Sequence, residues 1–491
     1  MTAIKEMKKK YPYNVLVDAG DVFSGTLYFN KYLGQADLEF MNLVGYDAMT
    51  FGNHEFDKDT ETLAAFIKNM KFPMVSANVN VTKDPALSPL FQNKYATTTK
   101  DGEMYKGIVK TINGEKVGIF GLTTEDTKNI AMGIGSVTFD NYINAAKEAV
   151  ANFEEQGVNK IIALTHLGYD DGDMDSDVSL ANHVEGIDII VGGHDHKKIE
   201  APVKVSKFTE PTIIVQANEY SKYLGTLNVG FDKNGKVVSH EGALIELDAK
   251  DEAGKYVIPD DMEALDILET KYKPAVEELK AQVVGSSTVD LLGGNPAART
   301  AETNLGNFIA DGMLAKAKTI NSKTSIAIQN GGGVRTTLNA GDITTADILK
   351  VLPFGNTLGI MELTGNEILE TLEHAVAKAP EANGAFLQIS GMKYTYDSSK
   401  NKGERVVAVQ VEKEGEFVDL VPTEKYVVAT NMFTATGGDG FEALKKASDE
   451  GRVSNPGNVD WEIFKEHLEA QPNKTISPKV EGRIVDIAKN N

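Results

Sequence analysis

The sequence has no cysteine among its 491 residues. This absence excludes disulfide bonds, thiolate metal ligands and cysteine nucleophiles. The side chains of His, Asp, Asn and Glu are therefore the available ligands for a metal ion. The absence leaves the compartment open, because exported proteins also fold without cysteine.

Long hydrophobic runs are also absent, and no segment is long and apolar enough to span a membrane. The first ten residues are basic but lack the apolar stretch of a signal peptide. Ala3, Ile4 and Met7 follow helical spacing instead, which predicts an amphipathic helix that begins at Thr2. As written, the sequence predicts a soluble chain with no targeting segment.

Basic residues are outnumbered, with 50 Lys and Arg against 71 Asp and Glu and a formal net charge of −21. A chain this acidic is not expected to hold a nucleic-acid polymer, since that requires basic side chains that displace counterions. A small anion remains compatible where metal ions or arginines reverse the charge locally. We therefore expect a small-molecule partner and no nucleic-acid polymer, and the oligomeric state stays open.

The sequence does contain a regular alternation of short apolar runs and helix-like segments, from about residue 13 to residue 250. This alternation is typical of an α/β layered domain. Residues 259–282 are highly charged, with apolar residues at helical spacing, and predict a connecting helix kinked at Pro274. A second mixed α/β domain follows, with helical patterns at residues 302–318 and 365–378. We place the domains at residues 1–255, 256–284 and 285–491.

Four of the apolar runs end in a short polar turn that carries carboxylate, amide or imidazole groups. In α/β sheets the loops at the carboxyl ends of the strands share one edge, so we expect the four turns to converge. The glycines in them permit close backbone approach. The turns are Asp18-Ala19-Gly20-Asp21, Gly52-Asn53-His54-Glu55-Phe56-Asp57, Thr165-His166-Leu167-Gly168 and Gly192-Gly193-His194-Asp195-His196.

Each turn alone is weak evidence, because a lone loop histidine is usually a surface residue and Gly-Asp pairs are usually simple turns. Their joint occurrence is more specific, since half of the eight histidines lie in these turns. We expect Asp18 to order its turn and Asp195 to lie between ligands without being one. The other histidines have no motif, and we interpret them as structural or solvent-facing: His183, His240, His374 and His467.

Together these motifs resemble the calcineurin-like metallophosphoesterases. Residues 17–21 and 52–57 are similar to the 5′-nucleotidase/UDP-sugar hydrolase branch of that superfamily. The resemblance covers nearly the whole chain and implies an α/β protein with an N-terminal β-sandwich flanked by helices, a linker helix and a C-terminal mixed α/β nucleotide-binding domain. It also implies two divalent metal ions as cofactors, with Zn, Mn or Co as the candidates.

The same resemblance implies the ligands of both ions. Asp21 would bridge the two ions. Asn53, His166 and His194 would complete the shell of one ion, and His196 would belong to the other. Two ions about 4 Å apart hold a phosphate between them and lower the pKa of a shared water.

His54 is implied to be the transition-state residue, oriented by Asp57. A protonated His54 would stabilise or protonate the leaving oxygen, an effect of roughly 100-fold or more. Asp57, three residues later, would accept the other ring N–H and fix the tautomer. The structural alternative for Asp57 is an N-cap of the helix that begins near Asp59, and we favour the pairing with His54.

One motif of the family is missing. Its members begin with a strand that ends in Asp-x-His, and this sequence contains no such motif. One ion is then left with only Asp21 and His196, so it is expected to be weakly held or absent. Three explanations remain open: a truncated N-terminus, a one-metal protein with residual activity, or a nucleotide-binding protein without catalysis. We favour truncation, which also accounts for the missing signal peptide in a family that is typically periplasmic, extracellular or at the cell surface.

The second domain carries the run Asn330-Gly331-Gly332-Gly333-Val334-Arg335 directly after apolar residues 325–329. Such a run exposes backbone N–H groups and lets a ligand approach closely, although a lone run is more often a simple turn. Arg299 lies near a helix start, and arginines bind carboxyl or phosphate oxygens in bidentate fashion.

Two phenylalanines of this domain, Phe354 and Phe433, lie among small polar residues, which suits exposed rings. Two rings stacked on one base contribute about 1–3 kcal/mol each. We expect the other phenylalanines of comparable segments in the core: Phe308, Phe386 and Phe441.

The glycine run, the Pro353-Phe354 pair and the segment Gly437-Gly438-Asp439-Gly440-Phe441 resemble the C-terminal domain of 5′-nucleotidases. The resemblance implies that Phe354 and Phe433 sandwich the base and that Asp439 holds the ribose hydroxyls. The remaining implied contacts are the base edge for Asn330 and Gly332 and the phosphate side or ribose for Arg299 and Arg335.

The motifs together predict metal-dependent hydrolysis of nucleoside 5′-monophosphates to nucleoside and phosphate, with nucleoside diphosphate sugars as further substrates. The expected partner is therefore a small-molecule nucleotide. Three alternatives stay open: a 2′,3′-cyclic nucleotide phosphodiesterase/3′-nucleotidase, a thiosulfohydrolase of the sulfur-oxidation type, and a catalytically impaired nucleotide-binding protein.

Overall fold

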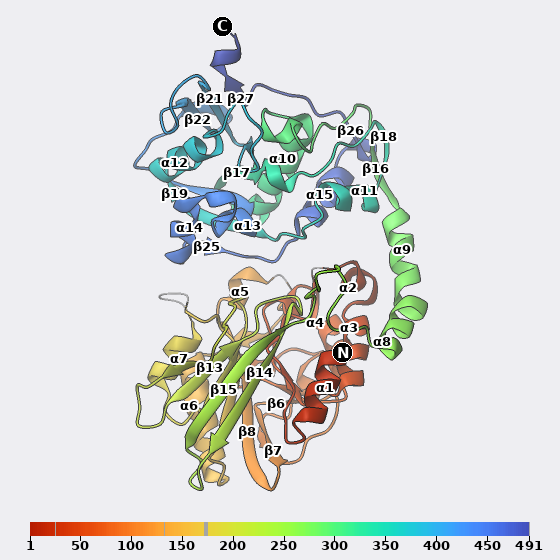
Figure 1. The fold of residues 1–491 in the computed structure, drawn as a ribbon, viewed down its shortest axis with the longest axis vertical. Coiled ribbons are helices and arrows are strands. Elements are labelled where there is room, and N and C mark those ends of the chain that lie inside the picture. The colour runs from red at the N-terminus through yellow and green to blue at the C-terminus, as the bar shows by residue number, and fades with distance from the viewer. Residues whose placement is uncertain (25, 132, 171–174, 491) are drawn as a thin grey trace. The chain divides into compact units, whose positions relative to one another are not determined.

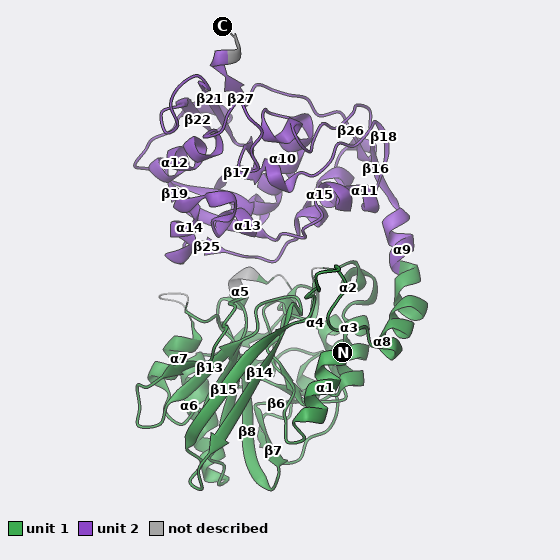
Figure 2. Cartoon of the chain, viewed as in Figure 1, with its two compact units in different colours: residues 1–275 green, residues 276–491 purple. Residues whose placement is uncertain are grey.

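The computed structural model describes residues 1–24, 26–131, 133–170 and 175–490 (Figure 1). The chain divides into two compact units, Met1–Ala275 and Val276–Asn491 (Figure 2). Each unit is built from both helices and strands, which confirms the predicted α/β class. The division falls inside the charged segment that the sequence predicts as the connection between domains.

Unit 1 contains two main sheets. The first has four short parallel strands in the order β1-β2-β3-β6. Three of them overlap apolar runs of the sequence, at residues 14–17, 47–51 and 73–77, and are shorter than those runs. The strands are β1 Val17–Asp18, β2 Ala48–Met49, β3 Met74–Val75 and β6 Met104–Tyr105.

The second sheet of unit 1 has seven strands in the order β12-β13-β11-β10-β8-β7-β5. Its central strands β8, β10, β11 and β13 are parallel, and β7 and β12 are antiparallel to their neighbours β8 and β13. The strands are β5 Tyr95–Ala96, β7 Gly107–Ile112, β8 Glu115–Thr123, β10 Ile161–His166, β11 Ile189–Gly192, β12 Val203–Val205 and β13 Thr212–Gln216.

Buried side chains from both sheets pack into one cluster. Ala48 and Val75 come from the first sheet, and Ile119 and Leu164 from the second. The two sheets therefore form the sandwich that the resemblance implies.

Helices and two further strand pairs, β4–β9 and β14–β15, complete unit 1. Helix α1 begins at Thr2, as the spacing of its apolar residues predicts. The apolar faces of α4 and α6 are buried in two further clusters, one for each helix. The elements are α1 Thr2–Lys10, α2 Leu27–Tyr32, α3 Gln35–Val44, α4 Thr60–Lys68, α5 Thr127–Ile130, α6 Tyr142–Glu155, α7 Asp177–His183, β4 Val79–Asn80, β9 Thr138–Phe139, β14 Tyr223–Phe231 and β15 Val237–Glu246.

The connecting segment is helical, as predicted. It consists of α8 Met262–Ile267, a π-helical turn Leu268–Tyr272 and α9 Lys273–Ala281. Proline at position 274 has no N–H and clashes with the carbonyl four residues earlier, so the wider π turn directly before it relieves that clash. The predicted irregularity at Pro274 therefore takes the form of a π turn.

Unit 2 is built around a five-stranded sheet in the order β20-β17-β24-β19-β25. Strands β17 and β24 are parallel neighbours at its centre, and β20 and β19 pair antiparallel with them. The strands are β17 Thr324–Asn330, β19 Leu358–Thr364, β20 Leu387–Ser390, β24 Lys425–Asn431 and β25 Val453–Ser454.

Two smaller sheets and several helices complete unit 2. Helices α10 and α12 begin and end within three residues of the predicted helical patterns. The helices are α10 Asn304–Ile320, α11 Thr345–Val351, α12 Gly365–Ala375, α13 Met432–Ala435, α14 Glu442–Asp449 and α15 Asp460–Glu469. The strands are β16 Val283–Ser287, β18 Gly341–Thr344 and β26 Thr475–Ile476 in one sheet, and β21 Met392–Tyr396, β22 Val406–Lys413, β23 Glu416–Asp419 and β27 Ile484–Asp486 in the other.

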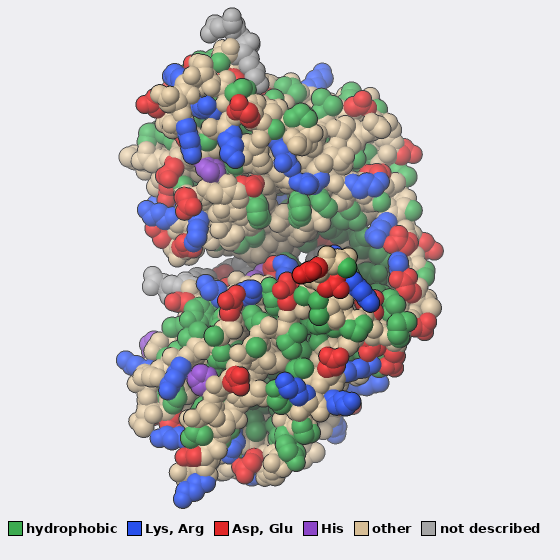
Figure 3. All heavy atoms as spheres, in the orientation of Figure 1, with side chains coloured by type: hydrophobic (Ala, Val, Ile, Leu, Met, Phe, Trp, Pro, Cys, Tyr) green, Lys and Arg blue, Asp and Glu red, His purple; other side chains and the backbone are tan. Residues whose placement is uncertain are grey.

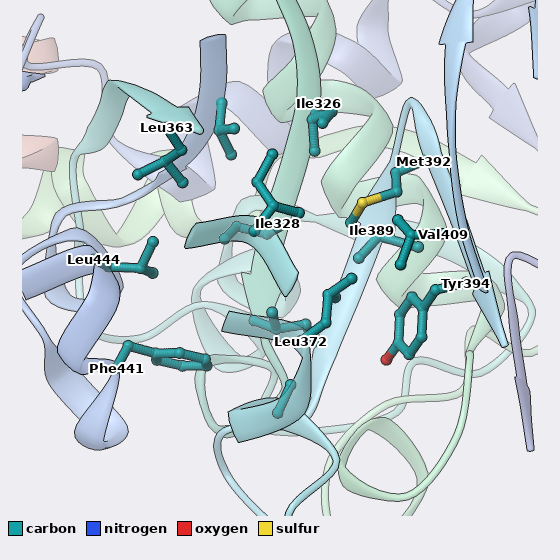
Figure 4. Packing of buried hydrophobic residues seen from close by; sticks show 14 of the residues in the cluster. Ile326, Ile328, Leu363, Leu372, Ile389, Met392, Tyr394, Val409, Phe441 and Leu444 are labelled. Atoms are coloured by element: carbon teal, nitrogen blue, oxygen red, sulfur yellow. The ribbon is translucent and has the colours of Figure 1, made fainter. Parts of the chain in front are cut away.

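The core of unit 2 lies between the five-stranded sheet and the helices that cover it. Figure 4 shows Ile328 of β17, Leu372 of α12 and Leu444 of α14 in one buried cluster. Each fully buried aliphatic side chain of this kind contributes about 1.5–3 kcal/mol to folding. The predicted core positions are confirmed, with exposed fractions of 6%, 2% and 1% for Phe308, Phe386 and Phe441.

Glu367 links helix α12 to its surroundings. Its carboxylate accepts the N–H of Thr364 at 2.8 Å and forms a bidentate pair with Arg452 at 2.6 and 3.1 Å. The hydrogen bonds from Arg452 lower the pKa of Glu367 to about 2. A depressed carboxyl pKa stabilises the folded state above the unfolded pKa, and this stability is lost as the pH falls through the folded pKa.

Glu367→Gln is therefore expected to lower the free energy of unfolding by about 1–2 kcal/mol at pH 7. The difference from wild type should shrink between about pH 5 and pH 2. Urea unfolding at pH 7 and pH 3 measures both effects. Glu381→Gln, at an exposed position of the same unit, is the matched control. An equal cost of Glu367→Gln at both pH values would contradict the charge-based explanation.

The surface carries acidic and basic side chains side by side, as one face in Figure 3 shows. In the ranges that the structure describes, no helix combines the length and the apolar composition needed to cross a bilayer.

Candidate metal centre and nucleoside site

The first two polar turns of unit 1 lie against each other. The N–H of Gly20 donates to Asp18 Oδ1 at 3.0 Å, so Asp18 orders its turn as expected. Gly20 has φ +92°, and a Cβ there would lie 2.2 Å from the backbone nitrogen of Gly52. Only glycine permits this approach. The turn after β1 is thereby fixed against the turn after β2.

Glu55 holds these two turns together, a role that the sequence analysis missed. Its fully buried carboxylate accepts backbone N–H groups of Asp21 and Gly52 at Oε2, at 2.8 and 2.6 Å, and of Val22 and Phe23 at Oε1, at 2.7 and 3.2 Å. The available signal was a carboxylate within the Gly-Asn-His-Glu motif, next to residues already singled out.

The third turn joins this pair from the other sheet. His166, the last residue of β10, donates from Nδ1 to the carbonyl oxygen of Ala19 at 2.7 Å. The turns that follow β1 and β10 therefore meet, although these strands belong to different sheets. Our prediction that one sheet edge gathers the turns was wrong on this point, because two sheets of a sandwich supply them.

Four of the predicted ligands form a continuous chain of contacts. His166 Nε2 lies 2.9 Å from Asp21 Oδ2 and 3.2 Å from Asn53 Oδ1. His194 Nδ1 lies 2.9 Å from the same Asn53 oxygen. Burial, followed by the charge of His166, lowers the pKa of His194 to about 3, so its imidazole is neutral and suited to bind a metal.

These spacings fit the shell of one divalent ion. Neighbouring ligand atoms around an ion with bonds of about 2.1 Å lie about 3 Å apart, and the contacts above span 2.9–3.2 Å. In the described ranges, no group of three His, Asp or Glu side chains is placed so that it could hold a metal ion without another ligand type. Asn53 is the residue that links His194 to the other two, so the amide oxygen is an essential member of the set.

His196, the ligand implied for the second ion, lies apart from this chain of contacts. Its Nδ1 lies 2.8 Å from Glu219 Oε2. Burial alone would raise the pKa of Glu219, but the hydrogen bonds with His196 and Lys222 lower it to about 2. The sequence analysis missed Glu219, which lies in a loop without a motif. Asp195 accepts hydrogen bonds from the Tyr169 N–H and from a glutamine, which agrees with the expectation that it is not a ligand.

His54 and Asp57 form the predicted pair. His54 Nδ1 lies 2.7 Å from Asp57 Oδ2, and its Nε2 lies 4.0 Å from Asp21 Oδ2. Burial would lower the pKa of His54, but the carboxylates of Asp21 and Asp57 together raise it to about 10. The alternative role of Asp57 as a helix cap is wrong, because Asp59 caps α4 through the N–H of Thr62.

Three of the four histidines without a motif have clear structural contacts. The ring of His467 packs against that of Phe308, with 4.6 Å between the ring centres. The ring of His183 bonds to Ser179 of its own helix. The ring of His374 has a different setting, because its Nε2 donates to the carbonyl oxygen of Asp439 at 2.9 Å. His374 thus supports the backbone of a predicted ligand-binding residue, whose φ of +56° lies in the left-handed region.

In unit 2 the glycine run and the loop that carries Asp439 lie together. Asn330 Nδ2 donates to Asp439 Oδ2 at 2.8 Å. A Cβ at Gly332 would lie 3.3 Å from the same carboxylate oxygen. The backbone of Ala298 packs on Gly331, which places the short helix with Arg299 against the glycine run.

The two predicted stacking rings are exposed, with 59% of Phe354 and 45% of Phe433 accessible. The guanidinium carbon of Arg335 lies 5.5 Å from the centre of the Phe354 ring. The ring of Phe433 packs against Gly438, beside Asp439. Both rings therefore adjoin other residues of the predicted nucleoside site.

Two family models match this chain. Residues 1–198 match the family model described as calcineurin-like phosphoesterase, and residues 283–446 match that of the 5′-nucleotidase C-terminal domain. The fold and these two matches thus define a two-domain phosphoesterase.

Individual relatives narrow this class. The chain is 42% identical over 99% of its length to the trifunctional nucleotide phosphoesterase protein YfkN of Bacillus subtilis, but spans only 34% of that protein. It is 32% identical to a 5′-nucleotidase of Diplobatis ommata, covering 99% of this chain and 83% of that one. The solved structure of the 5′-nucleotidase precursor from Thermus thermophilus is 39% identical, with a TM-score of 0.57, and the match covers 99% of this chain and 92% of that one. The chain belongs to the 5′-nucleotidase family.

Proposed function

We propose that this protein hydrolyses nucleoside 5′-monophosphates to nucleoside and phosphate in a reaction that depends on divalent metal ions. The observation that carries the proposal is the chain of contacts Asp21–His166–Asn53–His194, with the His54 imidazole beside it. Bound divalent ions would neutralise the phosphate and lower the pKa of the attacking water.

Within this proposal the ligand residues have separate tasks. Asp21, Asn53, His166 and His194 would hold one ion, and Asp21 and His196 would bind the other. The hydrogen bond from His166 to the Ala19 carbonyl fixes the ring so that Nε2 faces Asp21 and Asn53, which leaves this nitrogen as the one that would bind a metal ion.

His54 acts on the leaving group. Its Nδ1 is engaged by Asp57, so Nε2 is the nitrogen available to donate a proton to the 5′-oxygen of the departing nucleoside. The two neighbouring carboxylates keep the ring protonated. Unit 2 supplies specificity for the nucleoside: Phe354 and Phe433 stack on the base, and Asp439 accepts the ribose hydroxyls.

The test is phosphate release from 5′-AMP by the purified chain with Mn²⁺, Co²⁺ or Zn²⁺, and with EDTA as the control. We expect turnover with metal and none with EDTA. If adenosine binds saturably but none of these metals supports phosphate release, the hydrolytic function is wrong and the protein only binds nucleotides.

A second activity is favoured by the similarity to a trifunctional nucleotide phosphoesterase. The same assay therefore includes 2′,3′-cyclic AMP and UDP-glucose. Release of product from 2′,3′-cyclic AMP at a kcat/KM above that for 5′-AMP would replace the proposed function by that of a cyclic nucleotide phosphodiesterase.

A further inference from the structure

Three buried amide side chains form a hydrogen-bonded cluster, and one of them contacts the Asp439 carboxylate. Gln329 and Asn330 end strand β17, and Asn431 ends strand β24. These strands are parallel neighbours, so their carboxyl ends lie side by side. The three residues are 0%, 3% and 1% exposed. Sequence analysis singled out only Asn330, because the other two carry no motif of their own.

The hydrogen bonds of this cluster fix the orientation of the Asn330 amide. Its Oδ1 accepts from Gln329 Nε2 at 3.0 Å and from Asn431 Nδ2 at 2.9 Å. A carbonyl oxygen accepts two such bonds, so this oxygen is saturated. Its NH₂ group donates to Asp439 at 2.8 Å. The reversed amide would set its oxygen against a carboxylate and its NH₂ against two donors, so a single orientation is stable.

Asn431 has no alternative arrangement either. Its NH₂ also donates to Gln329 Oε1 at 3.2 Å, which together with the bond to Asn330 uses both hydrogens. Its Oδ1 accepts the N–H of Thr434 at 2.8 Å and thereby caps helix α13, which carries Phe433. One buried side chain therefore supports both the stacking ring and, through Asn330, the carboxylate of Asp439.

We propose that Asn431 is a positioning residue for ribose recognition. By holding the Asn330 NH₂ toward Asp439, it keeps this carboxylate directed as an acceptor for the 2′,3′-diol of a ribonucleoside. The inference rests on the proposed function and deepens it, because it assigns the preference for ribonucleosides to a buried amide rather than to Asp439 alone. A ligand without the diol forms no hydrogen bonds to this carboxylate, and sites built to bind a hydroxyl discriminate against such ligands.

The test compares the binding of adenosine and 2′,3′-dideoxyadenosine to the full chain in EDTA, by calorimetry, so that no turnover is needed. Wild type should prefer adenosine by about tenfold or more. Asn431→Ser keeps an N-cap oxygen for the Thr434 N–H but has no NH₂ group. It should reduce this preference at least about fivefold and change the affinity for dideoxyadenosine less than about twofold.

Two controls bracket the result. Asp439→Ala should abolish the preference, and Asn401→Ser, at an exposed asparagine of the same unit, should leave it at the wild-type value. An unchanged preference in Asn431→Ser, or an equal loss of affinity for both nucleosides, would overturn the positioning role. If wild type binds neither nucleoside, the nucleoside site itself is wrong and the inference fails with it. Phosphate release from 5′-AMP decides separately whether the hydrolytic function stands.

Discussion

Replacement of His54 by alanine is expected to lower kcat for 5′-AMP by about 100-fold or more and to change KM by less than about threefold. The reason is geometric. His54 is held at Nδ1 by Asp57 and directs Nε2 toward Asp21, at 4.0 Å, beside the candidate metal ligands. Its loss removes the proton donor for the leaving oxygen but leaves the contacts that bind the nucleoside. Steady-state kinetics with saturating Mn²⁺ measures both constants.

Two variants make this prediction specific. Asp57→Asn should lower kcat by about tenfold, because it weakens the orientation of the ring without removing it. His183→Ala should retain wild-type kinetics, since its ring contacts its own helix. If the His54→Ala protein keeps more than about a third of the wild-type kcat, His54 takes no part in the chemical step.

Replacement of Glu55 by alanine is expected to destabilise unit 1 by about 4 kcal/mol. The substitution leaves four backbone N–H groups without their acceptor, two of them buried and two partly buried. Each such group costs about 1–3 kcal/mol when unpaired, and relaxation of the two turns recovers part of that cost. Urea unfolding with and without Mn²⁺ measures the loss.

The same substitution should also release Asp21 from its position, so the affinity for Mn²⁺ should fall at least about tenfold. Glu155→Ala, at an exposed position of α6, is the matched control and should change neither property. Amide hydrogen exchange measures the effect at the turn itself. The amides of residues 21–23 should exchange faster in the Glu55→Ala protein than in wild type. If these amides exchange at the wild-type rate in the Glu55→Ala protein, Glu55 does not hold the two turns together.

Much of the candidate metal centre was predictable, because its ligands follow apolar runs and lie in glycine-containing turns. That pattern singled out the four turns, and the resemblance to the metallophosphoesterases implied Asp21, Asn53, His166 and His194 within them. The structure brings these four residues into contact. The His54–Asp57 pair was predictable for a similar reason, since a three-residue separation in one tight turn leaves few arrangements.

The residues that escaped prediction share one property: each acts through a polar contact with a segment that is distant in the sequence. Glu219 bonds to His196, and Asn431 bonds to residues 329 and 330. Neither stands in a motif. Such contacts depend on which strands are neighbours, and apolar patterning does not specify strand order.

The sequence by itself determined the residue types of both sites, the α/β class and the presence of a helical connection, because these follow from local spacing and from the chemistry of each side chain. The tertiary structure alone decided that two sheets, rather than one edge, gather the metal ligands, since strand pairing is a long-range property. It also decided that Glu55 joins the turns after β1 and β2 and that Asn431 orients Asn330 toward Asp439. A buried polar group must find a partner wherever the fold places one, and only the assembled chain shows which partner it is.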